Sequence, residues 1–164
     1  MSEDFYRRMT DSIRAKKYGP GLVNLLDKAL TMLVFFSYPA LLIYLYIFLE
    51  KKILLYIIWP FFCFLAVSIV RKRINAKRPY EVYDFQPIIK KETIGNSFPS
   101  RHVFSAFLIG MAFFSLNKRA GAEIFVLASL LSFIRVVGGV HFIKDVLAGA
   151  GAGLILGFIG FYLI

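Results

Sequence analysis

The sequence predicts an all-α fold, a polytopic membrane helix bundle with five transmembrane helices and an N-terminal amphipathic surface helix. Composition is the first reason, because 59% of the 164 residues are hydrophobic and the mean hydropathy is +0.68, more apolar than a soluble domain of this size requires. The second is the length of the apolar runs, and the third is that charged residues gather between them. A single domain over residues 1–164 is expected.

The first expected element is a surface helix over residues 4–17. Phe5, Met9 and Ile13 recur at every fourth position and would form one apolar stripe. A helix with such a stripe and a basic remainder is expected to lie in the membrane interface. The cations around the stripe are Arg7, Arg8, Arg14, Lys16 and Lys17.

Five apolar runs follow, separated by short polar turns. A helix needs about 20 apolar residues to cross a hydrocarbon core. The third run is the shortest, with about 17 residues and a length of about 25 Å, so its polar start should lie slightly below the headgroups. The spans are expected at about 22–49, 53–70, 100–116, 122–137 and 146–164.

Two features inside these spans carry further expectations. Asp27 and Lys28 stand near the start of the first span, where a helix end at the interface tolerates charge. Gly149, Gly153 and Gly157 recur every four residues in the last span, which predicts close approach of a neighbouring helix.

The formal charge of +10 narrows the possible partners to anionic lipid headgroups or a phosphorylated substrate. Nucleic acid is not expected, because the sequence has no basic helix or aromatic and basic platform. The single Cys63 lies in an apolar run and predicts neither a disulfide nor a thiolate metal site. With five spans, the surface helix, the loop over 71–98 and the turn at His141 all face one side of the membrane, so their polar residues can meet.

His141 and Asp145 are four residues apart, so on a helix they share one face. A carboxylate that accepts the Nδ1 proton leaves Nε2 as an oriented lone pair, as a nucleophilic histidine requires. The alternative is a helix cap or an ion pair between Asp145 and Lys144.

The segment Pro99-Ser100-Arg101-His102 precedes an apolar helix, whose start would offer unpaired N–H groups to an anion. Ser100 could equally be a simple N-cap. His102 stands at the edge of a hydrocarbon segment, where an ionisable side chain is costly unless it faces a polar cavity, and it is placed to act as a general acid.

A third polar segment ends the second span with Arg71, Lys72, Arg73, Lys77 and Arg78-Pro79. Such cations either bind phosphate or anchor the helix at anionic lipid.

Together the three segments resemble the signature of the type 2 phosphatidic acid phosphatase (PAP2) family. That signature is Lys, six residues and Arg-Pro; then Pro-Ser-Gly-His; then Ser-Arg, five residues, His, three residues and Asp. Here the parts are residues 71–79, 99–102 and 134–145, with the same internal spacing. Arg71 replaces the family's Lys, Arg101 its Gly and Ile134 its Ser, and five spans replace the usual six.

The resemblance implies that His141 attacks phosphorus, Asp145 holds its ring and His102 protonates the leaving oxygen. Phosphate oxygens would be held by Arg78, Arg135 and either Arg71 or Lys72, with backbone amides near Ser100 and Arg101 completing the cradle. It implies a phosphohistidine intermediate and neither metal nor cofactor.

The expected function is hydrolysis of a lipid phosphate, such as phosphatidic acid, phosphatidylglycerophosphate or a polyprenyl mono- or diphosphate. An inactive lipid-phosphate-binding protein and a phosphotransferase using the same histidine are the alternatives. Lipid phosphate and membrane lipids are the expected partners, and the sequence leaves the oligomeric state open.

The expected location is the cell membrane, with several passes. Lysines and arginines are more numerous on the side that carries the site, so the positive-inside rule places the site at the cytoplasmic face.

Overall fold

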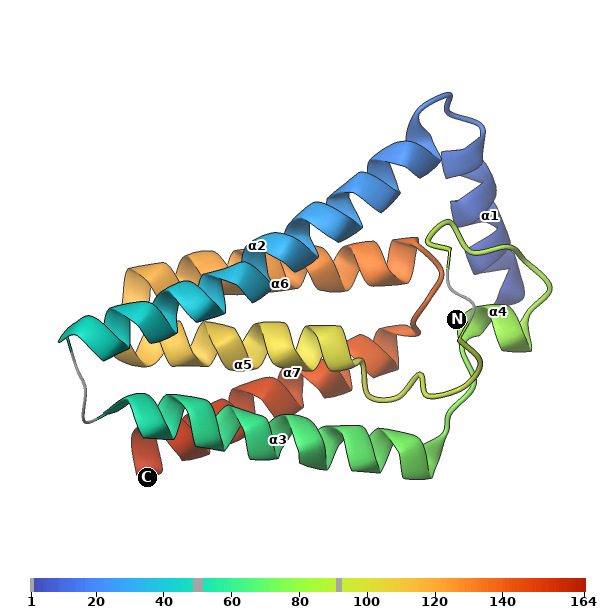
Figure 1. The fold of residues 1–164 in the computed structure, drawn as a ribbon. Coiled ribbons are helices and arrows are strands. Elements are labelled where there is room, and N and C mark those ends of the chain that lie inside the picture. Colours follow the sequence, from blue (N-terminus) through green and yellow to red (C-terminus); the bar gives the residue numbers. More distant parts are fainter. Residues whose placement is uncertain (1, 49–51, 91–92) are drawn as a thin grey trace.

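The computed structural model describes residues 2–48, 52–90 and 93–164, and these form helices and loops without a strand. The predicted all-α membrane bundle is confirmed. Two short helices, α1 (Glu3–Arg14) and α4 (Pro79–Val82), lie at one end of the bundle (Figure 1). The long helices are α2 (Gly19–Phe48), α3 (Ile53–Ile74), α5 (Arg101–Leu116), α6 (Lys118–Val137) and α7 (Ile143–Phe158), which continues as the π-helix η2 (Ile159–Leu163).

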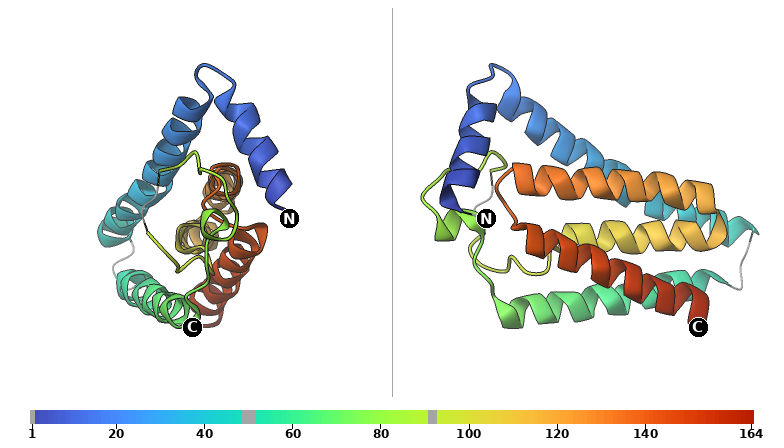
Figure 2. Two further views of the ribbon diagram at one scale, coloured as in Figure 1. Left: turned by 90° about the vertical axis from the view of Figure 1, so that its right-hand side faces the viewer. Right: turned by 180° about the vertical axis from the view of Figure 1, so that it is seen from behind.

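Helix α5 is the centre of the bundle. It contacts each of the other four long helices, and the end-on view in Figure 2 shows it enclosed by them. Nine of its sixteen residues are buried. Because the first residues of α5 belong to the polar segment at 99–102, this central position places that segment among the other helices.

Helices α2, α3, α6 and α7 with η2 are long and apolar enough to cross a membrane. Helix α5 has 16 residues and a length of about 24 Å, so it is shorter than a hydrocarbon core. Large apolar side chains cover much of the outer surface, among them Phe36, Phe61, Phe133 and Leu147. An outer surface of this kind suits contact with lipid chains.

Several helix boundaries differ from the expected ones: α1 ends at Arg14, α6 begins at Lys118 and α7 begins at Ile143. Two further differences have local reasons. Helix α2 begins at Gly19 rather than near residue 22, because Pro20 sits in the first turn, where its missing N–H removes no helical hydrogen bond. Helix α3 continues past residue 70 to Ile74 and ends at Asn75, which adopts a left-handed conformation with φ of 43°. The expected end of the first span at residue 49, and the turn at Glu50 and Lys51, lie outside the described residues.

The predicted glycine contact joins α7 to α5. A Cβ at Gly149 would lie 2.6 Å from the Ser100 carbonyl oxygen, and one at Gly153 would lie 2.6 Å from that of Phe104. A Cβ at Gly157 would lie 2.4 Å from the Met111 Cβ. These glycines therefore let the two backbones touch, which brings the first turn of α7 beside the start of α5.

Helix α1 packs across the loop that follows α4. Its fully buried side chains are Tyr6 and Thr10, whereas Phe5 from the expected apolar stripe is 46% exposed. Arg7 donates from Nε to the Asp84 carbonyl oxygen at 2.9 Å, and Arg14 donates to the carbonyl oxygens of Gln86 and Pro87 at 3.2 Å. The helix thus docks on protein through one face, and its location at a membrane surface stays a prediction.

Candidate active site

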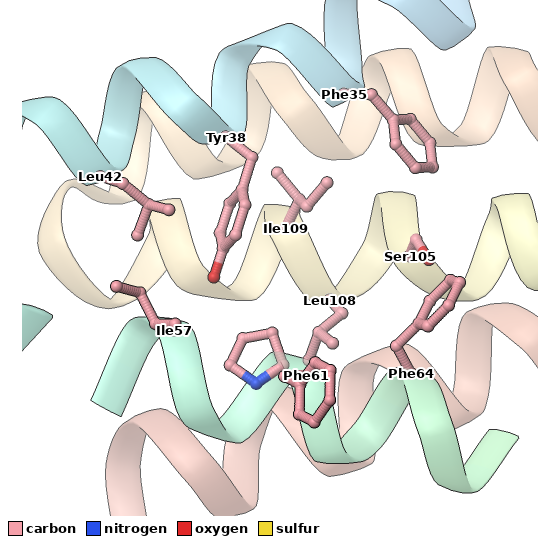
Figure 3. Close-up of a pocket in the computed structure, with 10 residues that line it drawn as sticks. Phe35, Tyr38, Leu42, Ile57, Phe61, Phe64, Ser105, Leu108 and Ile109 are labelled. Carbon is pink, nitrogen blue, oxygen red and sulfur yellow. The ribbon is translucent and has the colours of Figure 1, made fainter. Parts of the chain in front are cut away.

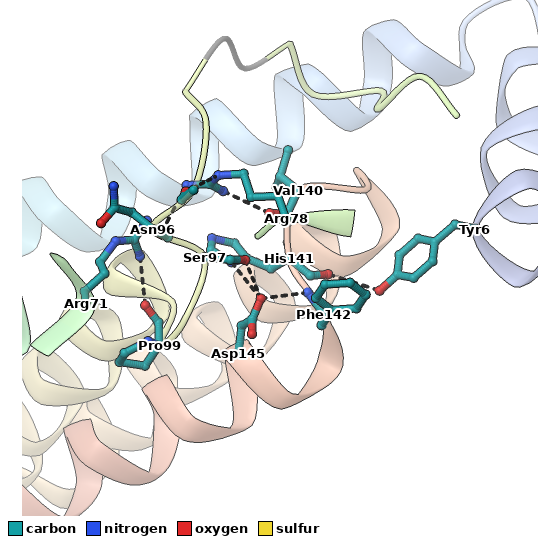
Figure 4. Close-up of polar contacts among 11 residues, drawn as sticks. Tyr6, Arg71, Arg78, Asn96, Ser97, Pro99, Val140, His141, Phe142 and Asp145 are labelled. Atoms are coloured by element: carbon teal, nitrogen blue, oxygen red, sulfur yellow. Dashed lines mark hydrogen bonds and ion pairs between the residues drawn. The ribbon is translucent and has the colours of Figure 1, made fainter. Parts of the chain in front are cut away.

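The three polar segments meet at the end of the bundle that carries α1 and α4 (Figure 4). Arg71 donates from Nη1 to the Pro99 carbonyl oxygen at 2.8 Å, which joins the first segment to the second. Arg78 donates from Nη1 to the Val140 carbonyl oxygen at 2.9 Å, which joins the first to the third. Residues that lie far apart in the sequence therefore form one site.

His141 and Asp145 are both fully buried, and Nδ1 of the histidine lies 3.5 Å from Oδ2 of the carboxylate. The same Oδ2 accepts a hydrogen bond from the backbone N–H of Phe142 at 3.0 Å, so Asp145 also caps the start of α7. The expected pairing and its capping alternative thus occur together. Lys144, by contrast, places its ammonium over the Phe142 ring at 5.4 Å from the centroid.

Ser97 is a site residue that the sequence analysis missed. Its hydroxyl donates to Asp145 Oδ2 at 2.5 Å and lies 3.3 Å from His141 Nδ1. The backbone N–H of Ser97 donates to the Ala76 carbonyl oxygen at 2.8 Å, which fixes this buried residue in the loop. No spacing rule marked a serine two residues before Pro99, so only the folded structure reveals it.

Tyr6 reaches the site from α1. Its hydroxyl donates to the His141 carbonyl oxygen at 3.3 Å, and its ring stacks on Phe85 with centroids 5.3 Å apart. Burial raises the pKa of the Tyr6 phenol above its usual value, so the hydroxyl stays protonated and remains a donor. The backbone of the histidine turn is therefore supported from a helix that the sequence analysis assigned to the membrane surface.

A polar pocket of about 440 Å³ opens at this end of the bundle. The described residues that line it include four cations and no carboxylate. Five of the predicted site residues are among them, which is consistent with an anion site. The lining residues are Ser68, Arg71, Lys72, Arg78, Thr93, Asn96, Arg101 and His102.

Arg78 is only 1% exposed and is held by the loops around it. Besides Val140, its guanidinium donates to the carbonyl oxygens of Gly95 at 3.1 Å and Asn96 at 3.5 Å. A guanidinium has five N–H donors, so these three bonds leave capacity for an anion. Arg78 therefore orders the site as well as lining it.

Ser100 begins α5 without a side-chain cap. It occupies the N-cap position of α5, but its buried hydroxyl makes no capping bond and has no hydrogen-bond partner among the described residues. Its backbone N–H donates to the Asp145 carbonyl oxygen at 2.9 Å and is not available to a phosphate. The expected cradle of amides would therefore begin at Arg101.

Arg135 is not among the residues that line the polar pocket. Its Nε lies 2.9 Å from Oδ1 of Asp27, and its Nη2 donates to the Thr31 hydroxyl at 3.4 Å. Asp27, expected as a charge tolerated at an interface, also has a specific partner, because its side chain is only 14% exposed and lies against a buried arginine. Ile134 packs in the apolar core at the position of the signature's serine.

A second pocket, of about 370 Å³, lies between α2, α3 and α5 and is almost entirely apolar (Figure 3). Two of its residues contact residues that line the polar pocket. The Arg101 guanidinium carbon lies 5.2 Å from the centroid of the Phe64 ring, and the ring centroids of Phe35 and His102 are 6.1 Å apart. The two pockets are therefore neighbours. The apolar pocket is lined by Phe35, Tyr38, Leu42, Ile57, Pro60, Phe61, Phe64, Ser105, Leu108 and Ile109.

The sequence model of the PAP2 superfamily matches residues 52–164, which is more than half of the chain. The chain belongs to the PAP2 superfamily. The matched part begins at the start of α3 and contains all three signature segments. In this PAP2 protein Tyr6 contacts the His141 carbonyl, and Asp27 pairs with Arg135, from helices outside the matched part.

A curated relative of this PAP2 protein is the bacitracin transport permease protein BcrC of Bacillus licheniformis. The two are 32% identical over 105 residues, which cover 62% of this chain and 52% of the relative. The match thus spans about half the length of that protein.

Two solved structures share the fold. LpxE of Aquifex aeolicus superposes with a TM-score of 0.72 at 25% identity, covering 96% of this chain and 92% of that one. The PAP2 type phosphatidylglycerolphosphate phosphatase of Bacillus subtilis superposes with a TM-score of 0.63 at 23% identity, covering 94% and 90%. Both comparisons extend over α1 and α2, beyond the part that the family model matches.

Proposed function

We propose that this PAP2 protein hydrolyses a lipid phosphate through a phosphohistidine formed on His141. The observation that carries the proposal is the buried group of His141, Ser97 and Asp145 beside a cationic pocket. The phosphatidylglycerolphosphate phosphatase that shares the fold supports the same class of reaction.

The chemistry follows from these contacts. His141 attacks phosphorus with Nε2, while Asp145 and Ser97 hold the ring through Nδ1. The P–O bond to the lipid breaks, and its electron pair stays on the leaving oxygen, which His102 protonates. Neutral His102 then activates a water that attacks the phosphohistidine and releases inorganic phosphate.

Arginine and lysine supply the positive charge that the transition state requires. Arg71, Arg78 and Arg101 line the pocket and would donate charge-assisted hydrogen bonds to the phosphate oxygens. No three histidine, cysteine, aspartate or glutamate side chains gather at one place within 2–48, 52–90 and 93–164. We propose that the reaction uses the cations in place of a metal.

The apolar pocket supports a lipid as substrate. It adjoins the polar pocket through Phe35 and Phe64 and lies at the depth of the membrane-spanning helices. A lipid whose phosphate is bound near His102 would have its hydrocarbon chain next to this pocket, where burial of the chain is favourable.

Phosphate release from lipid phosphates in detergent micelles tests the proposal. We expect release by the wild type with and without a chelator, and none above background with His141→Ala. Asp145→Asn should lower kcat by roughly 10²–10⁴-fold, because the ring loses its orienting partner. Lys144→Ala, which changes a neighbouring exposed cation, is the matched control and should stay active.

Trapping of the intermediate separates the proposal from its alternatives. A lipid phosphate that carries labelled phosphorus should label the wild-type protein. The label should be lost in acid and kept in base, and it should be absent from His141→Ala. Binding of the lipid without release or labelling would indicate an inactive binding protein. Transfer of the label to an added alcohol in preference to water would indicate a phosphotransferase.

A further inference from the structure

We propose that Arg101 forms a second anion subsite between the reacting phosphate and the hydrocarbon chain, and that the substrate is a lipid diphosphate. The inference rests on the proposed function and specifies its substrate class. It starts from the departure at this position, where the PAP2 signature has a glycine and this chain has a long cation.

Arg101 lies at the border of the two pockets. Its side chain lines the polar pocket, and its guanidinium lies over the ring of Phe64, which lines the apolar one. The ring covers one face of the guanidinium and leaves its N–H donors along the edge. Among the described residues these donors make no hydrogen bond or ion pair, so the edge can receive an oxyanion.

The other two arginines of the pocket belong to the reacting end. Arg71 is tied to the Pro99 carbonyl oxygen, and Arg78 to that of Val140, the residue before His141. The contact with Val140 holds the Arg78 guanidinium beside the nucleophile, and the contact with Pro99 fixes the Arg71 guanidinium in the wall of the polar pocket. Arg101 therefore adds positive charge on the side of the apolar pocket, next to Phe64.

A lipid diphosphate matches this order of groups. Its outer phosphate would lie at His141, its chain in the apolar pocket, and its inner phosphate between them, at Arg101. The inner phosphate adds negative charge to the substrate, and the pocket holds four cations without a carboxylate among its described lining residues.

The same position gives Arg101 a role in the chemical step. When His141 attacks the outer phosphorus, the bond from that phosphorus to the bridging oxygen breaks. The electron pair stays on the bridging oxygen, which becomes a terminal oxygen of the lipid monophosphate. Arg101 would stabilise the charge that develops there, and the phosphoryl group on His141 later passes to water as inorganic phosphate.

The experiment compares two substrates that share one chain, geranylgeranyl diphosphate and geranylgeranyl monophosphate. We expect the wild type to prefer the diphosphate in kcat/KM. In Arg101→Ala the ratio of the two kcat/KM values should fall by about tenfold or more, since the loss of a preorganised donor acts on the inner phosphate. Arg101→Lys should retain part of the preference, because an ammonium keeps the charge without the planar fork.

Arg73→Ala is the matched control, since Arg73 is an exposed cation on the last turn of α3 outside the pocket lining. The ratio should be the same in this variant as in the wild type. An unchanged ratio in Arg101→Ala, whether both rates fall together or neither falls, would overturn the second subsite.

A binding measurement keeps the test independent of turnover. In a His141→Ala background, inorganic diphosphate should bind more weakly when Arg101 is also replaced by Ala, with a smaller effect on inorganic phosphate. Equal weakening of both anions would overturn the inference. Absence of phosphate release from either lipid by the wild type would instead contradict the proposed function on which the inference rests.

Discussion

At the scale of single residues, Ser97 is the contact that the signature does not contain. Its hydroxyl lies 2.5 Å from the same Asp145 oxygen that faces His141 Nδ1, so one carboxylate oxygen serves three partners, with the Phe142 N–H as the third. The serine thereby limits how the carboxylate and the ring can turn. We regard it as a positioning residue.

Ser97→Ala should lower kcat by roughly 10- to 100-fold and leave KM nearly unchanged, because the substrate does not need the hydroxyl for binding. The rate of phosphohistidine formation, measured by rapid quench, should fall by the same factor. Ser132→Ala, which removes a hydroxyl bonded within α6 to the Ala128 carbonyl, is the control. A variant of lower Tm with unchanged phosphohistidine formation would show that Ser97 is structural only.

At the scale of helices, Asp27 joins α2 to Arg135, a residue of the third signature segment. Its carboxylate lies 2.9 Å from Nε of Arg135 on α6, and the arginine side chain is 5% exposed. Removing one member of a buried ion pair leaves an uncompensated charge, which commonly costs about 3–5 kcal/mol. The pair therefore fixes α2 against α6 and fixes the guanidinium as well.

Asp27→Ala should lower Tm in detergent more than the double variant Asp27→Ala/Arg135→Ala does. The single variant leaves a buried arginine without its partner, whereas the double variant leaves no unpaired charge. The coupling free energy from the double-mutant cycle should be about 3 kcal/mol or more, since it exceeds the cost of leaving one charge unpaired. Additive effects of the two substitutions would contradict the ion pair. Arg119→Ala, which breaks an exposed pair with Glu123, is the comparison and should change Tm little.

At the scale of the whole molecule, the two ends of the bundle differ in charge. The site, α1 and the loop after α4 lie at one end, and the turn between α5 and α6 lies at the other, as does the C-terminus (Figures 1 and 2). Cations gather at the first end, so the positive-inside rule predicts that this end faces the cytoplasm. The count of cations along the sequence includes Lys91 on the site's side and Lys51 on the opposite side, and both lie outside the described residues.

Single cysteines placed in a Cys63→Ser background test this orientation in intact cells. Lys90→Cys marks the site's end and Arg119→Cys the opposite end, and both positions are exposed. An impermeant maleimide should label Arg119→Cys directly and Lys90→Cys only after permeabilisation. The reverse pattern would place the site on the outer face.

The architecture could be predicted from the sequence because the features that specify it, apolar runs and glycine spacing, each lie within one segment of the chain. A long apolar run forms a helix in a membrane since every backbone group must be bonded within the segment, and glycines at every fourth position predict close contact without knowledge of the partner. The spacing of the three segments marked His141, His102 and Asp145 as candidate catalytic residues for the same reason. The pairing of Asp27 with Arg135 was not predicted, because the charge of a residue does not reveal which distant residue balances it.

The lengths of the apolar runs and the spacing of the polar segments were therefore enough to predict the membrane bundle, the family and the candidate residues of its signature. The other groups around these residues become visible only when the helices are packed. Ser97 and Asp145 are 48 residues apart, and Tyr6 and His141 are 135 apart. Such contacts depend on how α1, α2 and α5 pack against the rest of the bundle, because a hydrogen bond requires its two atoms to lie within about 3.5 Å whatever their separation along the chain.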